Sequence, residues 1–76
     1  MTTRYNFIHF EQHAYATHQA NADWVCRNNK TNTRLCNIVW YSTWNQWCMA
    51  LPLATAVFSA DCLADIQHFI SQLEKP

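Results

Sequence analysis

The chain has 76 residues and a formal net charge of zero, with 50% hydrophobic and only 13% charged residues. This length predicts one domain, residues 1–76. The neutral balance argues against electrostatic attraction to nucleic acid, and the high hydrophobic content argues against disorder. Residues 1–5 carry no apolar signal region, and the longest apolar run, residues 49–58, is interrupted by Pro52. We therefore expect neither a secretory leader nor a membrane span, and a cytoplasmic location.

The first half of the chain predicts three strands. Residues 5–13 alternate with apolar positions on both sides, which favours a strand covered on both faces near its start. Residues 14–21 are polar and mixed, so a connection or a strand extension is expected there. Residues 24–27 and 35–41 are rich in β-formers. Between them lies an asparagine-rich turn, in a chain that has no glycine to adopt left-handed conformations.

A hairpin closed near Thr31 would place Cys26 opposite Cys36. The register could differ by one residue, so whether these two thiols meet stays open at this stage.

The second half predicts a fourth strand and a helix. Residues 44–50 follow a turn at 42–43 and end before Pro52, because proline cannot donate to a ladder. Residues 53–57 suit a short edge strand or a crossover loop. Ser59 is a good N-cap, and Phe58 packs with Leu63 in a hydrophobic staple. The helix presents one apolar stripe: Leu63, Ile66, Phe69, Ile70 and Leu73.

These elements predict an α+β fold: an antiparallel sheet of about four strands, with one C-terminal helix packed on one face. Sequence alone leaves open which face the helix covers.

No catalytic or metal-binding motif stands out. The four cysteines are widely spaced with no C-x2-C pair, so we expect no zinc and no other cofactor. Cys62 lies in the predicted first helical turn, where the dipole would favour a thiolate, but Asp61 opposes this and packing beneath the helix is the simpler expectation. The absence of glycine excludes P-loop and dinucleotide motifs. The sequence therefore predicts a protein that is not an enzyme.

The main candidate feature is a surplus of aromatic rings. The chain has eleven, and three tryptophans fall within residues 40–47. One sheet face and one helix can hide only some of them, so we expect core packing for Trp40 and for one of Trp44 and Trp47. The rest predict a contact surface, since tryptophan and tyrosine are favoured interface anchors. The predicted protein-binding residues are Tyr41, Trp44 and Trp47, with Arg27 and Arg34 as a polar rim.

Residues 35–47 resemble a pattern found in small uncharacterised phage and prophage proteins, roughly L-G-x-I-x-W-Y-x-x-W-R-Q-Y. Trp24, Pro52 and the segment 63–70 also fit that resemblance. The chain departs from it at Cys36, Asn45 and Trp47, where the pattern has Gly, Arg and Tyr. The resemblance implies an origin in a mobile element and a compact sheet-plus-helix domain, and it implies no enzyme activity.

The leading hypothesis is a small non-enzymatic phage-type or prophage-type protein in the cytoplasm of a bacterial host. It would bind and inhibit a host protein or complex, such as a CRISPR or other defence component, in the manner of anti-CRISPR proteins. The alternative is a nucleic-acid-binding module that stacks bases on sheet aromatics, which the neutral charge disfavours. Formation of a homodimer is compatible with both. An enzyme using Cys62 or a zinc-bound water ranks last.

Overall fold

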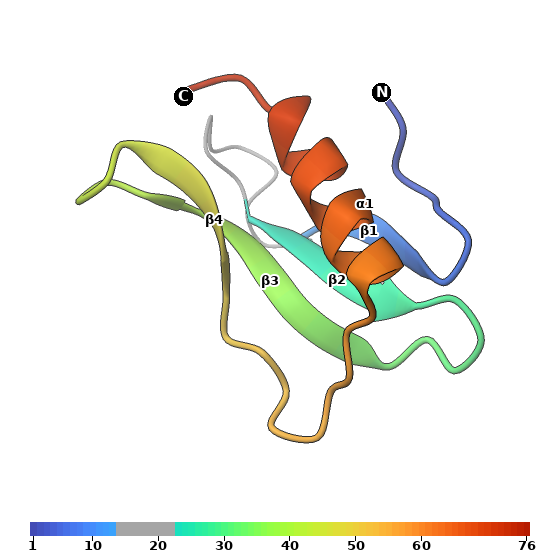
Figure 1. Ribbon diagram of the computed structural model, residues 1–76. Coiled ribbons are helices and arrows are strands. Elements are labelled where there is room, and N and C mark those ends of the chain that lie inside the picture. The colour runs from blue at the N-terminus through green and yellow to red at the C-terminus, as the bar shows by residue number, and fades with distance from the viewer. Residues whose placement is uncertain (14–22) are drawn as a thin grey trace.

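The computed structural model describes residues 1–13 and 23–76 (Figure 1). The connection or strand extension expected at 14–21 lies outside the described residues. Four antiparallel strands form one sheet in the order β1-β2-β3-β4, and a single helix follows, which confirms the predicted α+β class. The elements are β1 Ile8–Gln12, β2 Trp24–Asn28, β3 Arg34–Tyr41, β4 Gln46–Ala50 and α1 Ala60–Ser71.

The N-terminal residues fold back along β1 instead of extending it. The strand expected over residues 5–13 begins only at Ile8, because the backbone N–H of Tyr5 donates to the Ile8 carbonyl at 2.8 Å and closes a turn. The N–H of Phe10 then donates to the Thr3 carbonyl at 2.8 Å, and Arg4 forms a bridge with His9. The outer edge of β1 is therefore covered by the chain itself.

Two asparagines supply left-handed turns, and the sequence predicted an asparagine turn only between residues 28 and 33. Asn32 has φ 60° between β2 and β3, and Asn45 has φ 55° between β3 and β4. The second turn also includes Trp44, so β4 begins at Gln46 and not at residue 44. Residues 53–57 form no strand.

Leu51, just after β4, also has a positive φ, at 52°. That conformation costs a non-glycine residue about 1–2 kcal/mol. The Leu51 carbonyl accepts a 2.8 Å hydrogen bond from Nη1 of Arg34, which helps to hold the turn in place.

The helix begins as predicted, but its buried stripe is rotated. Ser59 caps it, since Oγ accepts a hydrogen bond from the N–H of Cys62 at 3.1 Å. The buried helix residues are Cys62, Ile66 and Phe69. Leu63 was expected in this stripe and that prediction is wrong: its side chain is 51% exposed. Cys62 lies one turn before Ile66 on the same face and takes the place expected for Leu63.

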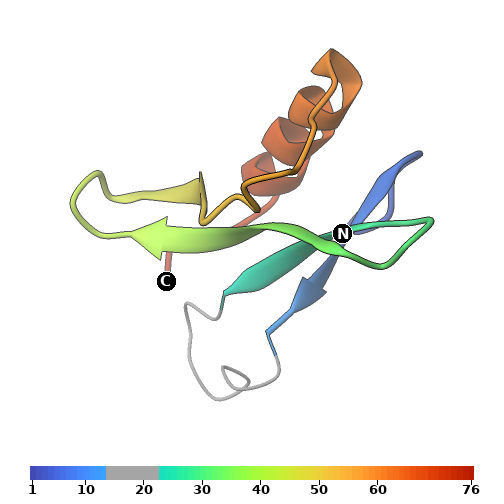
Figure 2. The same cartoon turned by 90° about the horizontal axis from the view of Figure 1, so that it is seen from below.

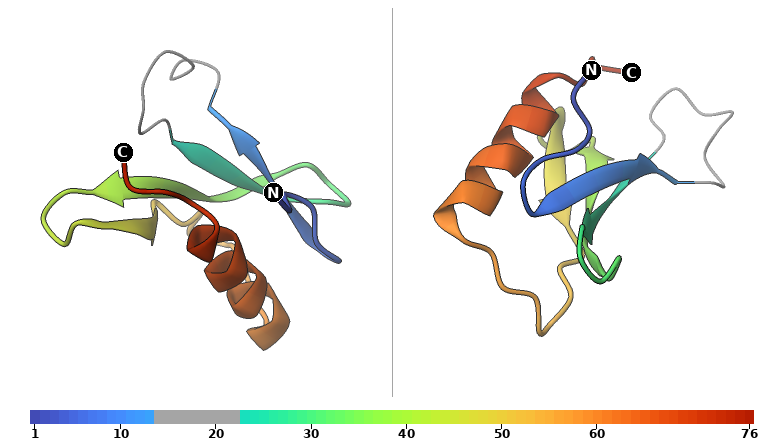
Figure 3. Two further views of the ribbon diagram at one scale, coloured as in Figure 1. Left: turned by 90° about the horizontal axis from the view of Figure 1, so that it is seen from above. Right: turned by 90° about the vertical axis from the view of Figure 1, so that its right-hand side faces the viewer.

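Helix and sheet meet through aromatic contacts. The ring of Phe69 is fully buried and stacks on Phe10 of β1, with centroids 3.9 Å apart, and it meets Trp24 of β2 edge-on at 5.2 Å. Figures 2 and 3 show the helix on one side of the sheet. No helix or strand of the described residues lies on the opposite face, which we call the open face. In that same part of the chain, no helix has the length and apolarity needed to cross a membrane.

The helix stripe gives a direct stability test. Phe69→Ala should lower the free energy of unfolding by about 3–5 kcal/mol, because it leaves a cavity between helix and sheet. Leu63→Ala, six residues earlier on the same helix, should cost less than about 1 kcal/mol because that side chain is already half exposed. Urea unfolding followed by circular dichroism measures both, and equal losses would contradict the observed orientation of the helix.

Candidate functional site

The structure divides the five predicted binding residues among three places. Tyr41 and Trp44 are exposed at the end of the β3–β4 hairpin. Trp47 turns toward the helix side, where its indole Nε1 donates to the Glu74 carbonyl at 2.9 Å and its ring meets Trp40 edge-on at 5.8 Å. Arg27 and Arg34 lie together, roughly 20 Å from Tyr41 along the sheet, at about 3.3 Å per residue. The expectation that only one of Trp44 and Trp47 packs inward is confirmed.

The first place is an exposed apolar surface on the hairpin. The side chain of Trp44 is 66% exposed and that of Tyr41 42% exposed, and the two rings meet edge-on with centroids 5.0 Å apart. The hairpin turn that carries them projects past the helix (Figures 1 and 2). With their neighbours the rings line a shallow hollow of about 230 Å³. We call this surface the aromatic ledge: Val39, Tyr41, Trp44, Cys48, Met49 and Ala50.

The alternation of the strands explains how the ledge forms. Val39 and Tyr41 are two residues apart on β3, so both point away from the helix. Cys48 lies directly opposite Val39 and therefore joins the same face. The intervening positions, Trp40 opposite Trp47, point to the helix side.

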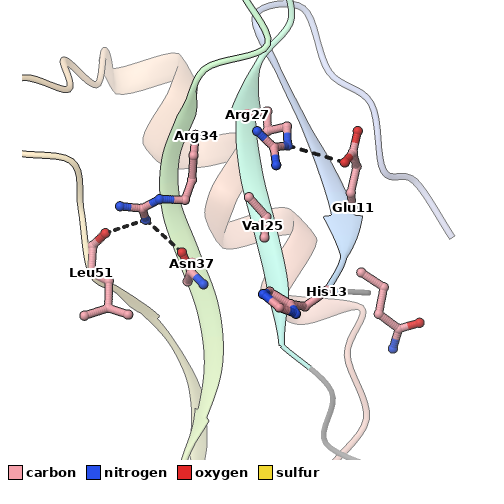
Figure 4. Close-up of a pocket in the computed structure, with 8 residues that line it drawn as sticks. Glu11, His13, Val25, Arg27, Arg34, Asn37 and Leu51 are labelled. Carbon is pink, nitrogen blue, oxygen red and sulfur yellow. Dashed lines mark hydrogen bonds and ion pairs between the residues drawn. The ribbon is translucent and has the colours of Figure 1, made fainter. Parts of the chain in front are cut away.

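The second place is a polar cleft on the open face, which Figure 4 shows in close-up. A bulge creates it. Cys26 is opposite Cys36, but Arg27 is opposite Arg34, so Leu35 is an extra residue on β3. Because of this bulge, the Leu35 side chain packs in the core and Arg34 lies on the same face of the sheet as Arg27. The cleft has a volume of about 480 Å³ and is lined by Glu11, Gln12, His13, Val25, Arg27, Arg34, Asn37 and Leu51.

The two arginines of this cleft are a like-charged pair directly across the ladder, an arrangement that disfavours folding unless the charges are compensated. Each guanidinium turns to its own acceptors (Figure 4). Nη1 of Arg34 donates to Oδ1 of Asn37 and to the Leu51 carbonyl, both at 2.8 Å. Nε of Arg27 lies 3.4 Å from Oε2 of Glu11, an ion pair without hydrogen-bond geometry. The lining thus holds two guanidinium groups and one carboxylate, so the cleft keeps a positive balance.

Sequence patterns did not reveal the partners of these arginines. Asn37 and Leu51 reach Arg34 only because the bulge turns it outward and because Leu51 adopts its left-handed turn. Glu11 reaches Arg27 across β1 and β2, where the residues stand diagonally to each other. A charge on one face of a predicted strand was the only signal available for Glu11.

The cysteines are mostly internal. Cys26 and Cys36 are opposite each other, which resolves the register that the sequence left open, and both are fully buried free thiols. A hydrogen bond to Cys36, and then burial, raise the pKa of Cys26 well above its ordinary value of 9.0, and the same hydrogen bond lowers the pKa of Cys36. Cys62 is buried beneath the helix, as expected of a packing residue. Within residues 1–13 and 23–76, no three His, Cys, Asp or Glu side chains gather as a metal-ligand set.

The buried thiol pair predicts a loss of stability at high pH. Above about pH 9 the unfolded chain ionises Cys26 while the folded chain keeps its proton, so unfolding releases a proton. The contribution of the protonated Cys26 thiol to the free energy of unfolding is fully present below about pH 9. It is lost as the pH rises further, by up to about 1.4 kcal/mol per pH unit. Urea unfolding under reducing conditions from pH 8 to 10.5 measures the slope. The double variant Cys26→Ala/Cys36→Ala should give a shallower slope than wild type, because removing Cys26 alone would leave Cys36 as a buried thiol, and equal slopes would contradict the assignment.

Comparison with known proteins assigns no family and no function to this chain. No family model, no curated protein and no solved structure matches the chain. The resemblance of residues 35–47 to phage proteins stays a prediction.

Proposed function

We propose that this chain is a non-enzymatic interaction domain that binds another protein through the aromatic ledge. The observation that carries the proposal is Trp44, which is two-thirds exposed beside Tyr41 on a hairpin that extends past the helix. Burying a large aromatic side chain stabilises a folded domain by on the order of 2–3 kcal/mol, and a domain this small would benefit from burying each tryptophan. An exposed ring on an ordered turn is therefore a candidate anchor.

The hairpin also restrains the two rings before a partner arrives. The edge-on contact limits the rotamers of Tyr41 and Trp44, and the Asn45 turn fixes the backbone that carries them. A side chain already ordered in the free protein loses less entropy on binding, which strengthens association. The hollow that the rings line together with Val39 and Ala50 can receive one apolar side chain of a partner.

The chemistry of the ledge indicates the kind of partner. None of its six residues is charged, so the complementary surface should be apolar and should bind without strong salt dependence. The resemblance to phage proteins makes host proteins of a bacterial cytoplasm, defence complexes among them, the first candidates. Inhibition would follow if the ledge covered a surface that the host complex needs.

Trp44→Ala should weaken binding to the host partner by about 2 kcal/mol, roughly 30-fold, without unfolding the domain. The measurement is affinity capture from a bacterial lysate, followed by titration calorimetry with the identified protein. Val57→Ala is the matched control, because Val57 is also an exposed apolar residue, at 86%, but lies outside the ledge. Unchanged binding by Trp44→Ala would contradict the proposal, as would loss of the fold in that variant.

Nucleic-acid binding is the second candidate, favoured by one observation. The polar cleft with its two arginines and the ring of Tyr41 lie on the same open face, which matches the arrangement of a basic groove with a stacking ring. Two facts weigh against it. The chain is neutral overall, and Glu11 stands in the cleft beside Arg27.

This candidate predicts salt-dependent binding of single strands. Fluorescence anisotropy with short labelled DNA and RNA oligonucleotides, from 50 to 200 mM salt, would give a log–log slope of about −1.4 if both arginines contact phosphates. The double variant Arg27→Gln/Arg34→Gln should remove that slope, and Leu63→Ala should leave it unchanged. Absence of binding at low salt would exclude the candidate without affecting the protein-binding proposal.

A further inference from the structure

The two edge strands of the sheet, β1 and β4, differ in whether their outer backbone groups are covered. On β1 the outer edge is covered by residues 3–5, through the hydrogen bond from Phe10 to Thr3 and the bridge between Arg4 and His9. In the part of the chain that the structure describes, β4 pairs only with β3, and no strand lies along its other side (Figures 1 and 3). An edge strand carries a row of backbone donors and acceptors that another strand can satisfy.

The sequence of β4 does nothing to block such pairing. Natural edge strands are protected by charged side chains, proline or a bulge. The five residues of β4, from Gln46 to Ala50, include no charge and no proline, and their register against β3 is regular. Met49 on this strand is 38% exposed and also lines the aromatic ledge, although alternation places it on the helix-side face with the half-buried Trp47. The strand is therefore open both in its backbone and in its side chains.

We propose that β4 pairs antiparallel with β4 of a second copy of this chain, around a two-fold axis at Cys48. This register uses all five residues of the strand, because Gln46 then lies opposite Ala50 of the second copy and Trp47 opposite Met49. The pairing covers the exposed Met49 thioether with an indole ring, a favourable sulfur–aromatic contact. A second copy fits better than a charged partner strand, since the strand is uncharged and the chain is neutral, so two copies do not repel.

The pairing would extend the sheet without changing its layers. A two-fold axis perpendicular to the sheet keeps both helices on one side and both open faces on the other. Cys48 belongs to the aromatic ledge, so the two ledges would adjoin across the axis. The inference goes beyond the proposed function, because self-association can occur whether or not a host protein binds the ledge.

Cys48 makes the register testable. Residues directly opposed in an antiparallel pair have Cα atoms about 4.5–5.5 Å apart, which is within the roughly 4.4–6.8 Å range that a disulfide spans. The other three cysteines are buried. Diamide, a two-electron oxidant that takes up the two thiol protons, should therefore link two copies through Cys48, and Cys48→Ser should abolish the link. In that background Gln46→Cys with Ala50→Cys should restore it, whereas Gln46→Cys alone should not.

Light scattering of the reduced protein should give about twice the 9.0 kDa mass of one chain. Met49→Lys should raise the dimer dissociation constant at least tenfold, because it places a charge against Trp47 of the second copy. Leu63→Lys, an exposed position on α1, should leave the dimer unchanged. A monomer at high concentration would overturn the inference. So would a dimer that Met49→Lys leaves intact, or one that does not link at Cys48. Loss of host binding by Trp44→Ala concerns only the proposed function.

Discussion

The stack of Phe69 on Phe10 is the contact on which the arrangement of this molecule depends. It fixes one helix, with one apolar stripe, against one face of the sheet. A twelve-residue helix has no second stripe with which to cover anything else. Within the described residues no helix or strand covers the opposite face, and Tyr41 and Trp44 at the end of the β3–β4 hairpin are exposed, so the side chains that alternation directs there become the candidate functional surface. Both proposals for this protein start from what the helix does not cover.

Local signals predicted most of the fold. The presence of four strands, the asparagine-rich turn between β2 and β3 and the Ser59 cap depend on residues near one another in the chain, and each agrees with the structure. The errors are long-range. The N-terminal residues fold back because they find partners on β1 and at the C-cap of α1, where Gln72 and Thr2 exchange two hydrogen bonds. Leu63 is exposed because the helix docks through Cys62, which hydrophobicity alone did not favour.

The binding surface was predicted only in part, for a physical reason. The two-residue period sorts side chains into two faces but does not say which face the helix will cover, so Trp44 and Trp47 were equivalent in the sequence. The arginines lie far from the rings along the strands, and Arg34 reaches the open face only through the bulge at Leu35, whose extra residue is invisible to a pattern that assumes regular alternation. Which face the helix covers and where the β2–β3 register shifts both depend on contacts between elements, and local composition carries little information about such contacts.

The sheet order has a consequence for synthesis of the chain. Strands that are neighbours in the sheet are neighbours in sequence, so the sheet can assemble from successive hairpins as they leave the ribosome. The helix comes after all four strands. Until it has emerged, the face that carries Phe10, Cys26 and Ile38 has no cover, and the nascent chain offers chaperones a sheet with one bare apolar side. Docking of the helix therefore removes the apolar surface that a chaperone could bind.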